Sequence, residues 1–502
     1  MTMSDQPSSP LVVESEPLGE PRLLIGGELR FATDDARYLD INPATEEPVG
    51  EVADASVADV DCAISAARRA FDETTWSTDS AFRQRCLLQL QEALERDREL
   101  LRQELIAEVG APLLTTYGPQ LDMPLAEAVS YPARAIDEFE WERELPLANG
   151  QNGPSRRTVV KEPVGVVGAI IPWNFPLEIT LHKLAQALAT GNTVVLKPAP
   201  DTPWSGTHLG RLIAERTEIP SGVVNVITSK SHSAGQQLVE DPRVDLISFT
   251  GSTATGRRIV ELGAATYKRM FLELGGKSAS ILLDDADFET VLPGAALVCI
   301  HSGQGCALPT RVLLPRSRYA EGVTLIAASL AAVKVGDPND PEVLAGPLIN
   351  ASQRDRVLGY IKTGIEEGAR LVCGGGRPAR LDRGYYVEPT LFADVDNRMR
   401  IAQEEIFGPV LVVIPFEDDD DAVAIANDSI YGLSGSVNSA SDERALGVAR
   451  RLRTGTVSVN SGSWYAADSP FGGYKASGIG RQGGIEGLAQ YVETKTIALP
   501  AR

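Results

Sequence analysis

The feature that most constrains the fold is a regular alternation of short apolar runs and amphipathic stretches in the middle of the chain. Three apolar runs are each followed by a stretch with helical spacing: 193–197 then 204–215, 223–227 then 234–239, and 244–250 then 254–262. Strands joined by helices of this length form right-handed crossovers, so the strands lie parallel in one sheet. The pattern therefore predicts an α/β domain of a type that commonly binds nucleotides.

The other segments extend this α/β reading. The chain has 502 residues, which is too long for one hydrophobic core and indicates two or three domains. Helical spacing predicts long helices at 57–72 and 81–109, and a second, less regular α/β half begins with a strand at 278–283 and a helix at about 288–298. Strands and hairpin turns are expected at 23–55, two β-branched runs around Glu162-Pro163 at 156–171, further α/β elements at 412–427 and a strand at 491–498.

Charge and cysteine content exclude several classes of protein. A formal net charge of -21 argues against binding to nucleic acid, because a phosphate-binding surface needs clustered lysine and arginine. The five cysteines show no metal-ligand spacing and the four histidines are not paired, so we expect no metal site and a reducing, cytoplasmic compartment. No run approaches the ~20 apolar residues that span a bilayer, and the polar start of the chain predicts a mobile tail at 1–20.

One cysteine has an unusual setting. Cys306 follows Gly303 and Gly305, and glycines allow a substrate and backbone N–H groups to approach a thiol closely. The segment is suited to a nucleophilic cysteine. A buried cysteine that acts as a small hydrophobic residue is the alternative interpretation.

Two further residues are candidates for catalysis. Glu273 stands between apolar residues just before a glycine pair, and partial burial would make it a general base. Asn174 lies between Pro172 and Pro176, which suits a fixed amide that donates to an oxyanion. A capping or salt-bridged glutamate and a merely rigid turn are the respective alternatives.

Two further features could bind a phosphate-containing cofactor. Gly251 and Gly256 flank hydroxyl residues at a predicted strand-to-helix turn, which suits a pyrophosphate at a helix N-terminus. Lys197 ends a predicted strand, where sheets of this kind meet their ligands. An ordinary turn and a solvated lysine fit the same residues.

Considered together, these segments resemble the aldehyde dehydrogenase superfamily along nearly the whole chain, from Leu24 to Ile497. The resemblance is carried by IPWNFP, GNTVVLKP, FTGST, LELGGKS, GQGCA, EEIFGPV and PFGGYKASGIGR, and by the separation of Glu273 from Cys306. It implies an α/β fold with a Rossmann-like parallel-sheet cofactor domain, a second α/β catalytic domain and a small β oligomerisation flap. The expected parts are a cofactor domain at 21–144 and 164–275, a catalytic domain at 276–476, and oligomerisation segments at 145–163 and 477–502.

The resemblance also implies a reaction. Cys306 would attack an aldehyde to give a thiohemiacetal, with the oxyanion held by Asn174 and the Cys306 backbone N–H. After hydride transfer the product thioester would be hydrolysed, with Glu273 as the base that activates the thiol, the water or both. A CoA-acylating relative is an alternative, although such relatives often lack this base. A non-catalytic binding protein derived from the family is another alternative.

For the cofactor, the resemblance points to one set of residues: Ile171, Trp173, Lys197, Gly251, Ser252, Gly256, Leu274, Glu405 and Phe407. NAD is the favoured cofactor, and NADP stays possible. Many NAD-preferring relatives have an acidic residue three positions after the strand-end lysine, whereas this chain has Pro200 there, followed by Asp201.

The expected substrate is a neutral, medium-sized aliphatic or aromatic aldehyde. His182 occupies the position where relatives acting on carboxylated semialdehydes tend to have arginine, and Glu178 would repel an acid. The expected substrate contacts are Phe175, Glu178, His182, Trp464, Tyr465 and Phe471. Near Cys306, Pro309 departs from the small residue usual in the family.

The expected assembly is a homodimer or homotetramer. No nucleic acid or membrane partner is expected.

Overall fold

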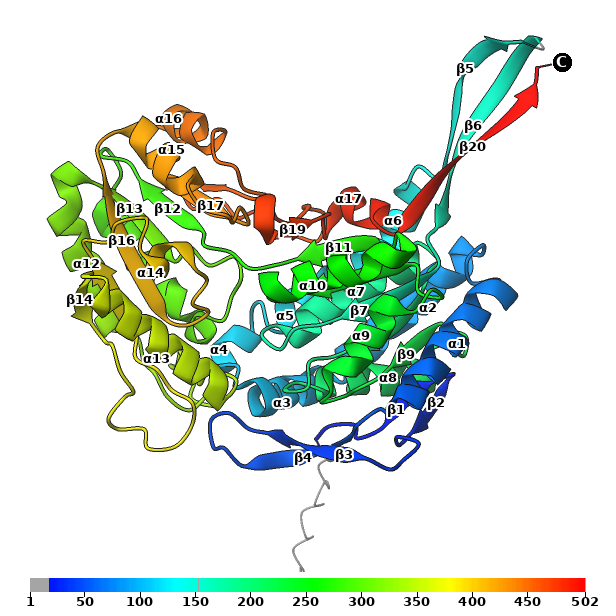
Figure 1. Ribbon diagram of the computed structural model, residues 1–502, viewed down its shortest axis with the longest axis horizontal. Coiled ribbons are helices and arrows are strands. Elements are labelled where there is room, and N and C mark those ends of the chain that lie inside the picture. Colours follow the sequence, from blue (N-terminus) through cyan, green and yellow to red (C-terminus); the bar gives the residue numbers. More distant parts are fainter. Residues whose placement is uncertain (1–17, 152, 502) are drawn as a thin grey trace, which may run out of the picture.

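The computed structural model describes residues 18–151 and 153–501. Most of the predicted tail at 1–20 lies outside these residues. The described chain forms two large sheets that lie side by side, a three-stranded sheet that projects from the body, and a small hairpin (Figure 1). Within the described residues, every helix is too short or too polar to cross a membrane.

The first large sheet confirms the predicted parallel α/β unit. Strands β7, β8, β9, β10 and β11 run parallel, and β1, β2 and β19 extend the sheet at its edges in antiparallel pairs. The order is β19 (Gly478–Ile479), β11 (Arg269–Glu273), β10 (Leu246–Thr250), β7 (Val166–Ile170), β8 (Thr193–Lys197), β9 (Val224–Val226), β1 (Leu23–Ile25) and β2 (Glu28–Arg30).

Helices cover both faces of this sheet. One face packs mainly against α2, α7 and α8, and the other against α1, α9 and α10, which gives two apolar layers. The bounds are α1 (Val57–Glu73), α2 (Ser80–Arg96), α3 (Arg98–Val109), α4 (Leu113–Thr116), α5 (Asp122–Glu127), α6 (Ser130–Glu138), α7 (Pro176–Ala189), α8 (Trp204–Arg216), α9 (His232–Glu240), α10 (Thr253–Gly263) and the 3₁₀ turn η1 (Ala264–Thr266).

The second large sheet forms the other α/β half. Its order is β14 (Arg370–Cys373), β15 (Thr390–Ala393), β16 (Val410–Phe416), β13 (Arg311–Pro315), β12 (Ala279–Leu282), β17 (Gly435–Asn438) and β18 (Ser458–Val459). The helical segments are α11 (Phe288–Val291), η2 (Leu292–Gly303), η3 (Arg316–Arg318), α12 (Tyr319–Ala331), α13 (Ala351–Glu366), α14 (Arg400–Gln403), α15 (Asp419–Asn427) and α16 (Asp442–Ala449). All pairs in this sheet are parallel except β14 with β15.

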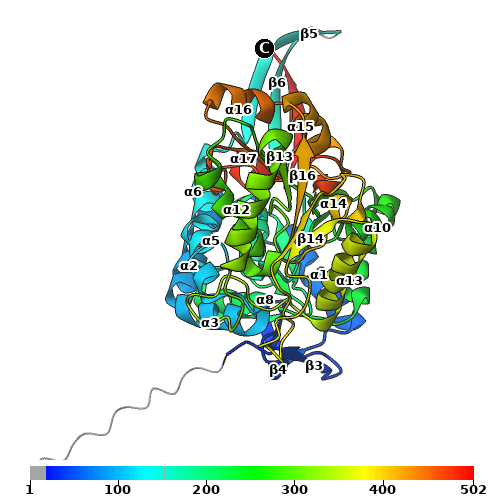
Figure 2. The same cartoon turned by 90° about the vertical axis from the view of Figure 1, so that its left-hand side faces the viewer.

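The remaining elements are mostly β-structure. β5 (Glu142–Gly150), β6 (Gly153–Pro163) and β20 (Val492–Pro500) form the projecting antiparallel sheet, and β3 (Arg37–Ile41) pairs with β4 (Pro48–Ala53). Figure 2 shows these two β units at opposite ends of the molecule. The last elements are the 3₁₀ turn η4 (Lys475–Ser477) and α17 (Gly484–Ala489).

Two helix predictions were wrong. The predicted helix at 81–109 is two helices, because Asp97 ends α2 and begins α3. The predicted helix at 288–298 is one short α-helical turn followed by the 3₁₀ segment η2. Pro293 has no N–H to donate and Gly294 is a poor helix former, so the α-helical pattern is not sustained there.

Candidate functional site

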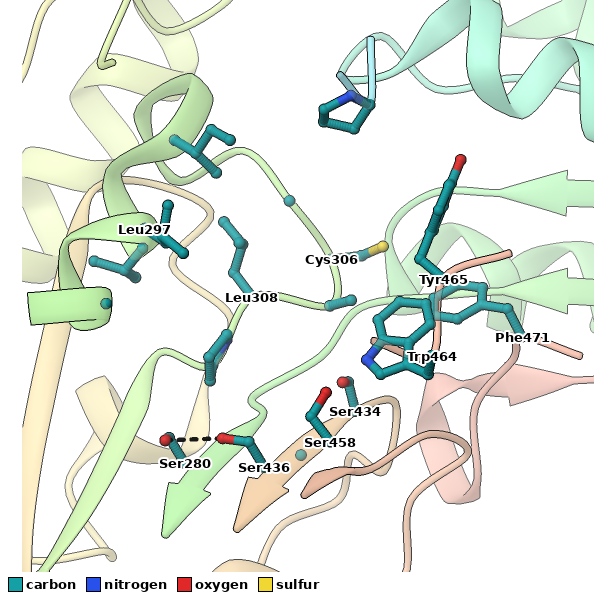
Figure 3. A pocket seen from close by; sticks show the side chains of 18 of the residues that line it. Ser280, Leu297, Cys306, Leu308, Ser434, Ser436, Ser458, Trp464, Tyr465 and Phe471 are labelled. Carbon is teal, nitrogen blue, oxygen red and sulfur yellow. Dashed lines mark hydrogen bonds between the residues drawn. The ribbon is translucent and has the colours of Figure 1, made fainter. Parts of the chain in front are cut away.

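The candidate nucleophile lies on a loop whose backbone is bent into an uncommon shape. His301, Ser302 and Gly303 follow one another at φ values of 47°, 53° and 74°. A Cβ atom on Gly303 would lie 2.1 Å from the carbonyl oxygen of Gly408, so only glycine fits there. The bend brings Cys306 to the wall of a cavity, and its side chain points into that cavity (Figure 3).

Asn174 is held next to this loop. It is buried, with 3% of its surface exposed, and its Nδ2 donates to the Gln304 carbonyl at 2.8 Å. Gln120 Nε2 donates to the Asn174 carbonyl at 2.8 Å and fixes the backbone from the other side. An amide nitrogen carries two hydrogens, so Asn174 retains one donor beyond the bond to Gln304.

Glu273 ends β11 beside Thr250, the last residue of β10, because the two strands pair in parallel register. The Thr250 hydroxyl donates to Glu273 Oε2 at 3.0 Å, and Lys183 Nζ lies 3.7 Å from the same oxygen. Burial raises the pKa of Glu273 above its usual value, while Lys183 and Thr250 oppose that change. The carboxyl group is thus a stronger base than a solvated glutamate.

The environment of the cavity raises the pKa of the Cys306 thiol as well. Burial raises the pKa of Cys306, and the carboxyl groups of Glu273, Glu405 and Glu178 raise it further when they are ionised, because they disfavour a second negative charge. The thiol is therefore protonated near neutral pH, and it needs a nearby base to become a nucleophile.

The cavity has a volume of about 610 Å³ and unites the predicted catalytic and substrate residues. Its lining includes Asn174, Glu273, Cys306, Phe175, Glu178, His182, Trp464, Tyr465 and Phe471, together with Pro309. The rings of Trp464 and Phe471 stack with centroids 5.2 Å apart. Figure 3 shows these rings with Tyr465 on one side of Cys306, and Leu297 with Leu308 on the other.

Beyond Leu308 the cavity continues toward the second sheet. Ser280, Ser436 and Ser458 are register neighbours on β12, β17 and β18, and Ser436 donates to Ser280 at 2.8 Å (Figure 3). The cavity is therefore larger than a one-ring aldehyde needs.

Some of the predicted cofactor residues form a second group next to the cavity. Gly276 N donates to Glu405 Oε1 at 3.0 Å, and burial raises the pKa of Glu405 to about 7. Phe407, at a left-handed φ of 62°, places its ring edge-on to Trp173 with centroids 5.3 Å apart. A carboxyl group and two aromatic rings thus lie together beside the glycine pair that follows Glu273.

The remaining predicted cofactor residues lie at the carboxyl ends of the first sheet. Lys197 ends β8, where its Nζ is 3.4 Å from the carbonyls of Pro198 and Ser229, and burial lowers its pKa to about 8. Ile171 follows β7 and donates its N–H to the Lys197 carbonyl at 3.0 Å. These residues do not line the cavity around Cys306.

The turn between β10 and α10 has the geometry of a helix start. Ser252 caps α10 by accepting from Thr255 N at 3.1 Å. A Cβ atom on Gly256 would lie 2.5 Å from Leu274 Cδ2, so glycine lets α10 pack against the residue after β11. Free N–H groups and the helix dipole at such a start favour a phosphate.

Asp201 has a different environment from the one that a ribose-binding carboxylate needs. Its Oδ1 accepts from Asn350 Nδ2 at 3.1 Å, and burial raises its pKa. Its hydrogen-bonding capacity is therefore used partly within the protein, and Pro200 has no polar side chain to replace it.

The sequence interpretation missed Lys183, Gln120 and Thr250. Lys183 is fully buried on α7, over the ring of Phe271 at 4.2 Å, and burial lowers its pKa. The signal was a lone lysine in an otherwise mostly apolar helix. Gln120 and Thr250 carried no local signal, because their roles depend on contacts with Asn174 and Glu273.

Comparisons of the sequence with known proteins match one protein family. The model of the Aldehyde dehydrogenase family matches residues 31–497. A 3-succinoylsemialdehyde-pyridine dehydrogenase from Pseudomonas sp is 43% identical over 91% of this chain and 94% of its own. A geranial dehydrogenase from Castellaniella defragrans is 41% identical over 95% of this chain and 98% of its own.

Solved structures agree with the sequence matches. A Mycobacterium tuberculosis aldehyde dehydrogenase complexed with NAD+ is 44% identical and superposes with a TM-score of 0.91, covering 97% of this chain and 99% of that one. A mutant of aldehyde dehydrogenase C from Pseudomonas syringae, complexed with NAD+ and octanal, is 38% identical with a TM-score of 0.90, covering 96% and 97%.

Proposed function

The chain belongs to the aldehyde dehydrogenase family, and from that premise we propose that it oxidises a neutral aldehyde to a carboxylic acid with NAD. The observation that carries the proposal is the meeting of Cys306, Glu273 and Asn174 at one cavity. These groups supply a nucleophile, a base and an oxyanion donor, which acyl chemistry on a thiol requires.

In the proposed reaction, Glu273 takes the proton of the Cys306 thiol as the sulfur attacks the aldehyde carbon. The Asn174 amide donates to the oxygen that becomes negative. NAD, when bound, supplies the hydride acceptor that allows the adduct to become a thioester. Once Glu273 has released the thiol proton to solvent, it takes a proton from the water that attacks the thioester and returns that proton to the departing sulfur, which releases the acid and the thiol.

The residues at the ends of the first sheet, together with the group around Glu405 and Phe407, fit a dinucleotide. The start of α10 at Ser252 and Gly256 suits the pyrophosphate, and Lys197 and Glu405 are polar groups for the two ribose rings. Trp173, Phe407, Ile171 and Leu274 would provide apolar contacts. NAD is supported over NADP for two reasons. Two solved relatives are named as NAD+ complexes. The proposed cofactor residues include no arginine, the side chain that accommodates the 2′-phosphate of NADP.

The aldehyde is proposed to be medium-sized and uncharged. The cavity wall contains Phe175, Trp464 and Phe471, and its described lining residues include no lysine or arginine that would pair with an acid. One relative is named a geranial dehydrogenase, and the structure of another is a complex with octanal; both aldehydes are uncharged.

The test is a kcat/KM panel with hexanal, benzaldehyde and succinic semialdehyde, run in parallel with NAD and NADP. We expect the two neutral aldehydes to exceed succinic semialdehyde by at least about tenfold, because its carboxylate would lose its hydration in a cavity whose described lining residues include no lysine or arginine. NAD is expected to exceed NADP, and added CoA is not required. Comparable activity with succinic semialdehyde, or a need for CoA, would refute the proposal.

Replacing Asn174 with alanine is expected to lower kcat by about 10² to 10³, the usual cost of losing one oxyanion donor. The substitution also leaves the Gln304 carbonyl without its partner. Steady-state kinetics at saturating aldehyde measure the effect, and thermal unfolding monitors the fold. A kcat within a factor of about three of wild type, at equal stability, would exclude this role for Asn174.

The protein is further proposed to be a cytoplasmic homodimer or homotetramer. All five cysteines are free, which fits a reducing compartment.

The sheet of β5, β6 and β20 projects from the body (Figure 1) and exposes Leu147, Ile497 and Leu499 by 66%, 46% and 60%. Such an apolar edge needs a partner. Sedimentation velocity should give a dimer or tetramer, and a stable monomer would contradict this assignment.

A further inference from the structure

Glu178 is a carboxyl group in the cavity wall that the proposed reaction does not use. It lies on α7, four residues after Asn174 and four before His182, and all three line the cavity. Within α7, Glu178 and His182 lie on one side of the helix, about one turn of ~5.4 Å apart. Glu178 is in the first turn of α7, and the Asn174 amide that would bind the aldehyde oxygen precedes that helix and lines the same cavity.

The contacts of Glu178 leave one carboxyl oxygen available. The Tyr465 hydroxyl donates to Oε1 at 3.3 Å, and His182 Nε2 lies 3.5 Å from the same atom. In the described parts of the chain, no hydrogen bond reaches Oε2. The side chain is only 12% exposed, and Figure 3 shows Tyr465 on the side of the cavity toward which the Cys306 sulfur points.

The cluster carries little charge near neutral pH. Burial, with a contribution from Glu273, raises the pKa of Glu178 to about 8, and burial lowers the pKa of His182 to about 4. The carboxyl group is therefore mostly protonated and the imidazole neutral. A neutral carboxyl group can both donate and accept a hydrogen bond.

Large apolar side chains line the cavity together with Glu178 and Tyr465. Phe175, Ile179 and Trp464 line the same part of the cavity, so a substrate that fills it with hydrocarbon removes water from Glu178 without replacing its hydrogen bonds. A site built to hydrogen-bond a substrate hydroxyl discriminates against an analogue that lacks it, because the buried polar group is left unpaired.

We propose that Glu178 and Tyr465 form a hydrogen-bonding pair for a neutral hydroxyl group on the substrate, in the cavity that also holds Cys306. The preferred substrates are then hydroxylated neutral aldehydes, such as a benzaldehyde with a hydroxymethyl group in the para position. This inference rests on the proposed aldehyde oxidation at Cys306. An ammonium group would require the ionised carboxylate, so the neutral hydroxyl is the better match.

Three para-substituted benzaldehydes of similar size test the inference: 4-ethyl, 4-hydroxymethyl and 4-aminomethyl. In the wild-type protein with NAD, we expect kcat/KM for the hydroxymethyl compound to exceed that for the ethyl compound at least tenfold. The Glu178→Leu variant should bring this ratio to one or below, and Glu178→Gln should retain part of it, because an amide still donates and accepts. Tyr465→Phe should reduce the ratio.

The matched control is Glu215→Leu, on an exposed position near the end of α8, which should keep the wild-type ratio. A wild-type ratio of one or less, or an unchanged ratio in Glu178→Leu, would overturn the inference. So would the highest kcat/KM with the aminomethyl compound, which would assign the pair to a cation instead.

A binding measurement separates this inference from the proposed reaction. In the Cys306→Ala variant, calorimetry should show at least tenfold tighter binding of the hydroxymethyl compound than of the ethyl compound. This difference without any turnover in the wild type would support the role of Glu178 and refute the oxidation. Equal affinities would overturn the role of Glu178 whatever the turnover.

Discussion

Replacing Cys306 with alanine is expected to lower kcat for aldehyde oxidation by about 10⁴ or more, the scale seen when a covalent nucleophile is removed. Among the described residues that line the cavity, Cys306 is the one thiol. Without its sulfur no covalent adduct forms, and an aldehyde bound as such is a poor hydride donor. The loss should appear in kcat, with aldehyde binding retained.

The measurement is NADH formation followed by absorbance, with Cys62→Ala as the matched control. Cys62 is exposed on α1, far from the cavity lining, so its loss should leave kcat close to wild type. Thermal unfolding of both variants separates a chemical effect from a folding effect. A Cys306→Ala protein that keeps a tenth or more of wild-type kcat would contradict the assignment.

Replacing Glu273 with glutamine is expected to lower kcat by about 10² to 10⁴, the usual contribution of a positioned general base. Glutamine keeps the size of the side chain and can still accept from the Thr250 hydroxyl, so the fold should persist. It cannot take a proton from the thiol or from water. Both the attack on the aldehyde and the hydrolysis of the thioester should slow.

The pH dependence gives the same residue a second test. Glu273 must be deprotonated to act, so wild-type kcat/KM should rise with pH through the pKa of this carboxyl group. Burial raises that pKa, which moves the rise to a higher pH than a solvated glutamate would give. Glu273→Gln should lack this rise. An unchanged rise in the variant would assign it to another group.

The fold was largely predictable because its signals are local. The strands at 193–197 and 246–250 are mostly apolar and buried along their whole length, and helices with apolar spacing separate them. The sequence also predicted β20 and the two β-branched runs around Glu162-Pro163, which form β6 and β7. Helix ends were less predictable: apolar spacing continues across Asp97 and Pro293, whereas the chain stops or changes helix type there.

The site was predictable where a motif identifies it and not where distant contacts create it. Cys306, Glu273 and Asn174 stand in recognisable segments, and the structure brings them to one cavity. The contact between Glu178 and Tyr465 joins residues 287 positions apart, so no local pattern could indicate it. The burial of Lys183 beside Glu273 likewise depends on how α7 packs on the first sheet.

The measurement that tests the central assignment most directly is the mass of the protein quenched in acid during turnover of benzaldehyde and NAD. We expect a fraction of chains to be heavier by one benzoyl group, and peptide mapping should place that group on Cys306. The adduct should be absent from Cys306→Ala. NADH formed in the same sample without a thioester on Cys306, or with the acyl group on another residue, would contradict the account.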